Sequence, residues 1–153
     1  MKSIIGVTRL AAAVWLAVAL AACATAPTQE MSDARQSVQV AQDAGAEQYG
    51  VQNLRNARDH LQRAERELEL RYFSSARQDA ELAKNEAIKA HNVSLALKAA
   101  QTAIDNSKAA ADIVEQAKGL LTAAMEAAGQ GRDKKAIQLA EDAKRKAEGM
   151  TFE

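Results

Sequence analysis

Apolar residues recur every three or four positions from about residue 33 to residue 148, and polar residues fill the positions between them. That spacing places the apolar residues on one face of an α-helix. Alanine supplies most of these positions, and it has the highest helix propensity of all residues. The pattern predicts an all-α fold of alanine-rich antiparallel helical hairpins that pack as a coiled-coil-like bundle.

Turn residues divide this pattern into four predicted helices. The first two cover about residues 33–46 and 51–70, with Gly50 in the turn between them. The last covers about residues 133–148 and follows the sequence GQGR, whose glycines are typical of a turn.

The third predicted helix is the long central element of the fold. It starts after the turn sequence RYFSS, with Ser74 as a candidate N-cap, and continues to about residue 128 without a proline. At 1.5 Å per residue such a helix is roughly 80 Å long. Asn92 and the pair Asn106-Ser107 are its weakest points.

The predicted helices form a three-helix domain over residues 32–100 and a distal hairpin over residues 101–153. Each contact between alanines buries little area, so the stability depends on a few larger residues. These are Leu54, Leu61, Leu68, Leu82, Leu97, Ile104, Val114, Leu121 and Ile137. Folding the hairpins about their turns places Leu61 near Leu82 and Ala136 near Met125. A distal part of only two helices leaves apolar surface uncovered, which predicts a partner or self-association.

The two predicted hairpins also resemble each other at an offset of 60 residues. Alanine-rich stripes match one another by chance, so the similarity indicates either a true duplication or a shared pattern. Nine residues recur: Leu61, Ala64, Ala76, Gln78, Ala80, Glu81, Ala83, Lys84 and Ala87 match Leu121, Ala124, Ala136, Gln138, Ala140, Glu141, Ala143, Lys144 and Ala147.

The first residues are typical of an export signal. Lys2 and Arg9 precede an apolar run over residues 10–22, which is shorter than the roughly 20 residues that a membrane-spanning helix needs. Its end, Leu20-Ala21-Ala22-Cys23, resembles the lipobox of bacterial lipoproteins. Residues 1–22 are therefore predicted to be a signal peptide, and residues 23–31 a lipidated cysteine and tether.

The lipobox makes Cys23 the predicted lipidation site and the mature N-terminus. Palmitate and related acyl chains on this residue would anchor the protein, because two or three chains together hold it stably in a membrane. The chain has one cysteine, so we expect neither a disulfide nor a cysteine metal site. The residue after Cys23 is Ala24. An aspartate at this position would resemble an inner-membrane retention signal, so its absence favours the outer membrane, with the protein facing the periplasm.

The charge pattern argues against nucleic acid as a partner. Of 20 basic residues, two lie in the predicted signal peptide, which leaves 18 against 20 acidic residues. The two signs are interleaved along the chain, whereas phosphate binding needs a clustered basic face.

No residues in the sequence form a recognisable catalytic or cofactor-binding motif. His60 and His91 have no second ligand at metal-binding spacing, and a thin alanine-packed bundle offers little pocket in which carboxyl groups could be tuned for catalysis. We expect no enzyme activity, no cofactor and no metal site. Tyr49, Tyr72 and Phe73 cluster at the predicted turns, where they either plug the ends of a small-residue core, the favoured interpretation, or form a docking patch.

The segment from about residue 31 to residue 95 resembles a known protein family. The resemblance rests on the run Ala44 to Tyr49 before the first turn, on Tyr72 ahead of the long helix, and on two apolar stripes. The stripes comprise Leu54, Ala57, Leu61, Ala64, Ala76, Ala80, Ala83 and Ala87. These features resemble the bacterial envelope family called domain of unknown function 4398.

The resemblance implies an envelope protein, often a lipoprotein, without an established activity. Some members carry a peptidoglycan-binding domain similar to the C-terminal part of outer-membrane protein A. The sequence shows no such fusion, so peptidoglycan contact has no support from its residues.

These observations favour a lipid-anchored periplasmic helical protein of the outer membrane with a structural or scaffolding role, acting through an envelope protein partner or through self-association. The alternative is a module in the style of tetratricopeptide repeats that binds a peptide or protein. A third interpretation, a coiled-coil spacer like murein lipoprotein, is less favoured because the sequence ends in Thr-Phe-Glu and not in a wall-linked lysine.

Overall fold

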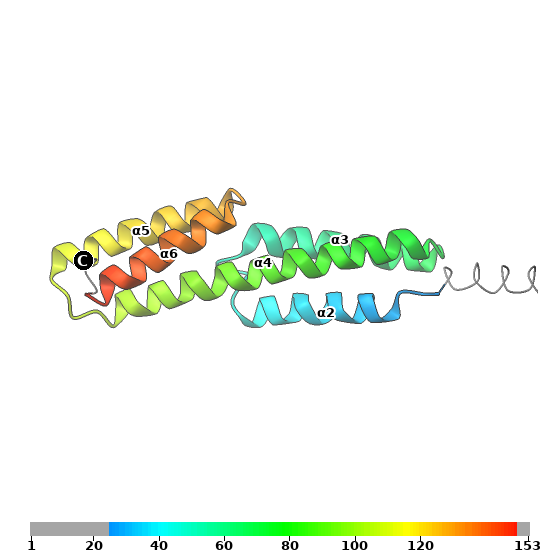
Figure 1. Ribbon diagram of the computed structural model, residues 1–153, viewed down its shortest axis with the longest axis horizontal. Helices are drawn as coiled ribbons and strands as arrows, with labels where there is room; N and C mark the ends of the chain where they lie inside the picture. The colour runs from blue at the N-terminus through cyan, green and yellow to red at the C-terminus, as the bar shows by residue number, and fades with distance from the viewer. Residues whose placement is uncertain (1–24, 150–153) are drawn as a thin grey trace, which may run out of the picture.

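The computed structural model describes residues 25–149, and this part of the chain is helical with no strand (Figure 1). The all-α prediction is therefore confirmed. Within residues 25–149 five helices follow one another: α2 (Thr28–Asp43), α3 (Val51–Glu69), α4 (Phe73–Asp105), α5 (Ala111–Gly129) and α6 (Asp133–Ala147). The predicted signal peptide and Cys23 lie outside the described residues.

Helix α4 joins two three-helix bundles. Its first half packs against α2 and α3, and its second half packs against α5 and α6. Figure 1 shows the two groups lying end to end along α4, so the second half of α4 takes the place in its bundle that α2 has in the first. The 33 residues of α4 span about 50 Å and give the molecule its elongated shape.

The two hairpins, α3–α4 and α5–α6, turn in the same way. Arg71 (φ 62°) and Gly131 (φ 69°), which are 60 residues apart, both have left-handed backbone conformations. The N–H of Tyr72 donates to the carbonyl of Glu67 at 2.8 Å, and the N–H of Arg132 donates to that of Ala127 at 2.9 Å. The 60-residue similarity in the sequence thus corresponds to two hairpins with equivalent turns.

Alanine forms the contacts between helices, as the spacing predicts. The stripe alanines of α3, α4 and α6 are buried almost completely, and each core also contains a few larger side chains. The larger side chains of the N-terminal core are Met31, Val38 and Leu54, and those of the C-terminal core are Val93, Leu97, Ile104 and Leu121.

The long central helix is confirmed, but its predicted extent is wrong. It ends at Asp105, and residues 106–110 form a non-helical connection before α5. The break falls at Asn106-Ser107, whereas Asn92 is accommodated within the helix. The chain gains a third helix for the distal bundle by breaking here, because α5 and α6 then cover the second half of α4.

Other details of the sequence prediction also require correction. The distal part is a three-helix bundle and not a two-helix hairpin. Leu82 and Met125 are 39% and 41% exposed, so neither is a core residue; each lies beside the buried stripe of its helix. Helix α2 begins at Thr28, and no side chain caps the start of α4, where Ser74 was the expected cap.

The two bundles meet at the start of α3. Gly50 lies so close to α4 that a Cβ there would stand 2.6 Å from the carbonyl oxygen of Ala90. The buried Asn53 amide donates to the Asp133 carboxylate, at the start of α6, at 2.7 Å. Tyr49 packs against the core of the C-terminal bundle. These contacts couple the two bundles to one another.

Candidate functional site

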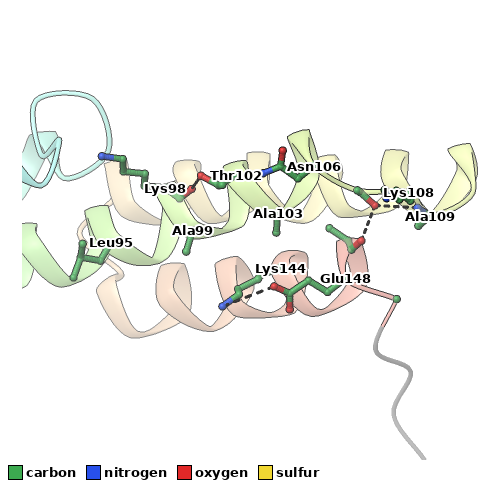
Figure 2. A pocket seen from close by; sticks show the side chains of 13 residues that line it. Leu95, Lys98, Ala99, Thr102, Ala103, Asn106, Lys108, Ala109, Lys144 and Glu148 are labelled. Carbon is green, nitrogen blue, oxygen red and sulfur yellow. Dashed lines mark hydrogen bonds and ion pairs between the residues drawn. The ribbon is translucent and has the colours of Figure 1, made fainter.

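A groove with a volume of about 940 Å³ lies between α4 and α6 in the described part of the protein. Leu95, Ala99 and Ala103 line it on α4, and Ala147 and Gly149 line it at the end of α6. Figure 2 shows Ala99 and Ala103 pointing from α4 toward α6, with Lys144 and Glu148 on the opposite wall. The floor of the groove is therefore apolar and made mostly of small side chains.

Small residues and the side chain of Ser107 shape this groove. Alanine at positions 99, 103 and 147 leaves space that a larger residue would fill. Beside the α4–α5 connection, the Ser107 hydroxyl donates to the carbonyl of Ala147 at 2.6 Å and accepts a hydrogen bond from the N–H of Ala109 at 3.2 Å. Ser107 thus satisfies a free carbonyl of α6 and ties the α4–α5 connection to the end of α6.

Lysines surround the groove on three sides. Lys98 lies on α4, Lys108 on the α4–α5 connection and Lys144 on α6, against the single carboxylate of Glu148. Lys144 lies 4.0 Å from Glu148, whereas Lys98 and Lys108 form no ion pair with any residue in the range 25–149. Lys144 lies in the last turn of α6, where its charge complements the helix dipole. Lys98, about two turns before the end of α4, is too far away for that role.

A smaller hollow of about 170 Å³ occupies the equivalent place in the N-terminal bundle. It lies between α2 and α4 and is lined by Gln36, Ser37, Val40, Ala87, Ile88 and His91. Ala87 here and Ala147 in the large groove are related by the 60-residue offset. Both hollows lie along α4, where Ile88 (43% exposed) and Leu95 (48% exposed) are one heptad apart.

The predicted aromatic cluster is divided by the fold. Tyr49 is half-buried at the joint between the bundles, where it packs against the C-terminal core. Tyr72 is 61% exposed in the α3–α4 turn, so it plugs no core. Phe73 starts α4 and is half-buried. The lipobox residues Leu20, Ala21, Ala22 and Cys23 are not among the described residues.

Both histidines are half-buried and thus less exposed than the sequence suggests. His60 Nδ1 lies 2.6 Å from a carboxylate oxygen of Asp79, and Arg63 lies 3.3 Å from the same oxygen. This cluster ties α3 to α4. Among residues 25–149 no three histidine, cysteine or acidic side chains gather as a metal site would require, and none of the helices there is long and apolar enough to cross a membrane.

Sequence reasoning missed Leu95, Lys98 and the other groove residues. The sequence could have indicated one wall of the groove, because Leu95 lies outside the buried stripe formed by Val93, Leu97 and Ala100. A large apolar residue outside the buried stripe marks an exposed apolar position. The second wall could not be found this way, since it depends on where α6 packs.

Comparison with known proteins identifies the family. The sequence model of the family described as "Domain of unknown function (DUF4398)" matches residues 29–105. The chain belongs to the DUF4398 family. The matched DUF4398 segment begins at the second residue of α2 and ends with the last residue of α4, so it includes α3, α4 and nearly all of α2. Helices α5 and α6 lie beyond it, and the groove combines a wall from the family segment with a wall from outside it. No curated protein and no solved structure gives a significant match.

Proposed function

We propose that this DUF4398 protein is a lipid-anchored, non-enzymatic protein of the outer membrane that faces the periplasm and holds a protein partner in the α4–α6 groove. The observation that carries the partner contact is the groove itself, with an apolar floor and lysines on three sides. The anchor rests on the lipobox that ends at Cys23.

The composition of the groove favours a protein segment as its occupant. Leu95 and the alanines offer apolar area for small aliphatic side chains, and such area is stabilised when it leaves water. Lys98 and Lys108, which have no ion-pair partner among residues 25–149, favour a segment that carries carboxylates. Protein–protein interfaces typically combine a desolvated apolar centre, where the hot-spot residues lie, with a polar rim.

A peptide-binding module in the style of tetratricopeptide repeats is the second candidate. The repeated hairpins and the two hollows in line along α4 favour it, since an extended polypeptide lying along α4 would fill both. The two candidates differ in how much of α4 the partner covers.

Photo-crosslinking in intact cells tests the partner contact and separates the two candidates. A photoreactive residue replaces Ala99 in the large groove, Ile88 in the small one, or Ala123 on the exposed face of α5 as a control. One dominant envelope protein linked from Ala99 alone supports a scaffold, and links from both Ala99 and Ile88 support a polypeptide-binding module. Self-linked species from Ala99 would make the partner a second copy, and equal labelling from Ala123 would contradict a groove-specific contact.

Membrane fractionation tests the anchor separately. We expect the protein to sediment with outer membranes and Cys23→Ser to abolish this, because the thiol is the acceptor of the lipid. An unchanged distribution for Cys23→Ser would contradict the anchor without affecting the groove.

A further inference from the structure

We propose that the α3–α4 turn, Leu70-Arg71-Tyr72, is a membrane-contact surface that rests on the lipid headgroups beside the Cys23 anchor. This proposal rests on the anchor in the proposed function. It assigns a lipid surface as the partner of the turn, and it gives the elongated molecule an upright orientation.

Two large apolar side chains are exposed in this turn. Leu70 is 62% exposed and Tyr72 is 61% exposed, the two highest values among the exposed large hydrophobic residues of the described chain. Tyrosine has an apolar ring with a polar end, and it is enriched where membranes meet water. Arg71 lies between the two and is also exposed, so its guanidinium is available to lipid phosphates.

The second hairpin shows that the turn does not need these residues. In the equivalent turn the corresponding residues are Gln130, Gly131 and Arg132, and the backbone hydrogen bonds are the same. Leu70 and Tyr72 are therefore not explained by folding. The apolar side chains occur only in the turn that lies close to the anchor.

Arg71 supports the same conclusion through its backbone. It has φ 62°, a left-handed conformation that is unfavourable for a residue with a Cβ, and it is the one non-glycine residue with positive φ in the described chain. Gly131 holds the equivalent conformation without that cost. A side chain at a position that favours glycine points to a role for the Arg71 guanidinium.

Covalent geometry places the anchor next to this turn. Arg77, in the second turn of α4, donates a hydrogen bond to the carbonyl of Thr25 at 3.4 Å. Cys23 precedes Thr25 by two residues, which span at most about 7 Å. Lipid on Cys23 therefore brings the membrane surface to the end of the molecule that carries Leu70 and Tyr72, visible at the right of Figure 1.

An upright orientation follows from these contacts. The start of α4 would lie at the membrane, and the α4–α6 groove would lie roughly 35–50 Å away along the same helix. The groove then faces the periplasm at a fixed height.

Tryptophan quenching in vesicles tests the contact directly. The chain from Cys23 onward has no tryptophan and a single thiol, so it can be coupled through Cys23 to maleimide-lipid vesicles of phosphatidylethanolamine and phosphatidylglycerol with brominated acyl chains. Tyr72→Trp reports on the proposed contact, and Arg132→Trp reports on the equivalent turn of the second hairpin. We expect about twofold quenching of the first, as for a residue at the interface, and none of the second.

A variant with the other turn's residues provides the matched control. Leu70→Gln and Arg71→Gly, added to Tyr72→Trp, copy the second hairpin, and they should reduce quenching toward the level of Arg132→Trp without unfolding the protein. Equal quenching at both tryptophans would mean that the molecule lies flat, and absence of quenching at both would mean that the turn does not touch lipid; either result overturns the proposal. The artificial linkage makes this test independent of natural lipidation, which the Cys23→Ser fractionation addresses.

Discussion

The two bundles share α4 and have equivalent hairpins, yet they are held together differently. In the N-terminal bundle, ion pairs join the helices: Arg35 with Glu65, His60 and Arg63 with Asp79, Arg77 with Glu30, and Lys84 with Asp33. In the C-terminal bundle, a hydrogen bond from Lys146 to Gln116 joins α6 to α5, and one from Ser107 to Ala147 joins the α4–α5 connection to α6. The groove beside the second bundle is also more than five times as large.

This difference shows that the residues that form the hairpin are not the residues that can bind a partner. The same alanine stripes and the same turn form both bundles, so they determine the fold. The charged residues around them differ: in the first bundle they pair with one another across helices, and in the second Lys98 and Lys108 stay unpaired within the described chain. An unpaired charge next to an apolar groove keeps its capacity to bind a partner.

The largest expected effect on the free energy of unfolding comes from truncating a large core residue in either bundle. Leu97→Ala in the C-terminal core and Leu54→Ala in the N-terminal core should each destabilise the protein by about 2–5 kcal/mol, because both side chains are almost fully buried. Since α4 belongs to both cores, we expect each variant to lower the midpoint of one cooperative transition, measured by circular dichroism and denaturant. Two separate transitions would show that the bundles fold independently.

The close approach at Gly50 should give the next largest effect. Gly50→Ala places a methyl group 2.6 Å from the Ala90 carbonyl and should cost about 1–3 kcal/mol, because backbone must move. Gly119→Ala, in an exposed part of α5 with open space around it, should stabilise by about 0.5–1 kcal/mol. Equal effects of the two substitutions on the free energy of unfolding would contradict the tight joint.

A smaller effect is expected at the hydrogen bond across the joint. Asn53→Ala removes the donor to Asp133 and should cost roughly 1–2 kcal/mol. Hydrogen exchange should show faster opening at the start of α6, where Asp133 lies. Asn85→Ala, on the exposed face of α4, is the control and should change the stability by less than about 0.5 kcal/mol.

The smallest effect concerns pH and the attachment of α2. A backbone hydrogen bond at Glu30, and then the Arg77 side chain, hold the pKa of Glu30 below its ordinary value of 4.5. Hydrogen bonds from Lys84, and then from Gln29, hold the pKa of Asp33 below its ordinary value of 3.8. The unfolded chain thus binds protons more tightly than the folded one, so this stabilisation is present above these ordinary values and is lost as the pH falls below them.

Hydrogen exchange followed against pH checks this prediction. Corrected for intrinsic rates, protection of α2 should decrease before that of the end of α6, which is tied by Ser107, a group that does not titrate in this range. Glu30→Gln with Asp33→Asn should remove the difference. An α6 that opens first on acidification would contradict the role of these ion pairs.

The apolar spacing was sufficient to predict the helices and most of their buried faces. Ala57, Ala64, Ala80 and Ala140 are all fully buried, as a 3.6-residue period requires. The period could not predict the end of α4, because residues 106–110 contain neither glycine nor proline. That break depends on tertiary contacts, in which Ser107 binds the end of α6 and α5 folds back on α4.

The candidate sites were less predictable than the fold. Tyr49 and Tyr72 look alike in sequence, since each lies at a turn, but one is packed against a core and the other is exposed. The groove needs two walls from helices that are about 40 residues apart in the chain, and sequence periodicity describes one helix at a time. The exposed Leu95 and Leu70 are recognisable only once the buried face of each helix is known.

The shared helix also implies a rule by which such a protein can be lengthened. Helix α4 ends one hairpin and becomes the first helix of the next bundle, so each unit supplies the platform on which another can be added. Residue Lys89, where α4 continues, corresponds to Gly149 (φ 72°), where the helical path of α6 is closed. Replacing Gly149 by lysine and appending a further copy of the residues that follow Lys89 would give a chain with a third unit, and a series of such chains would form a set of molecular rulers that differ by one step.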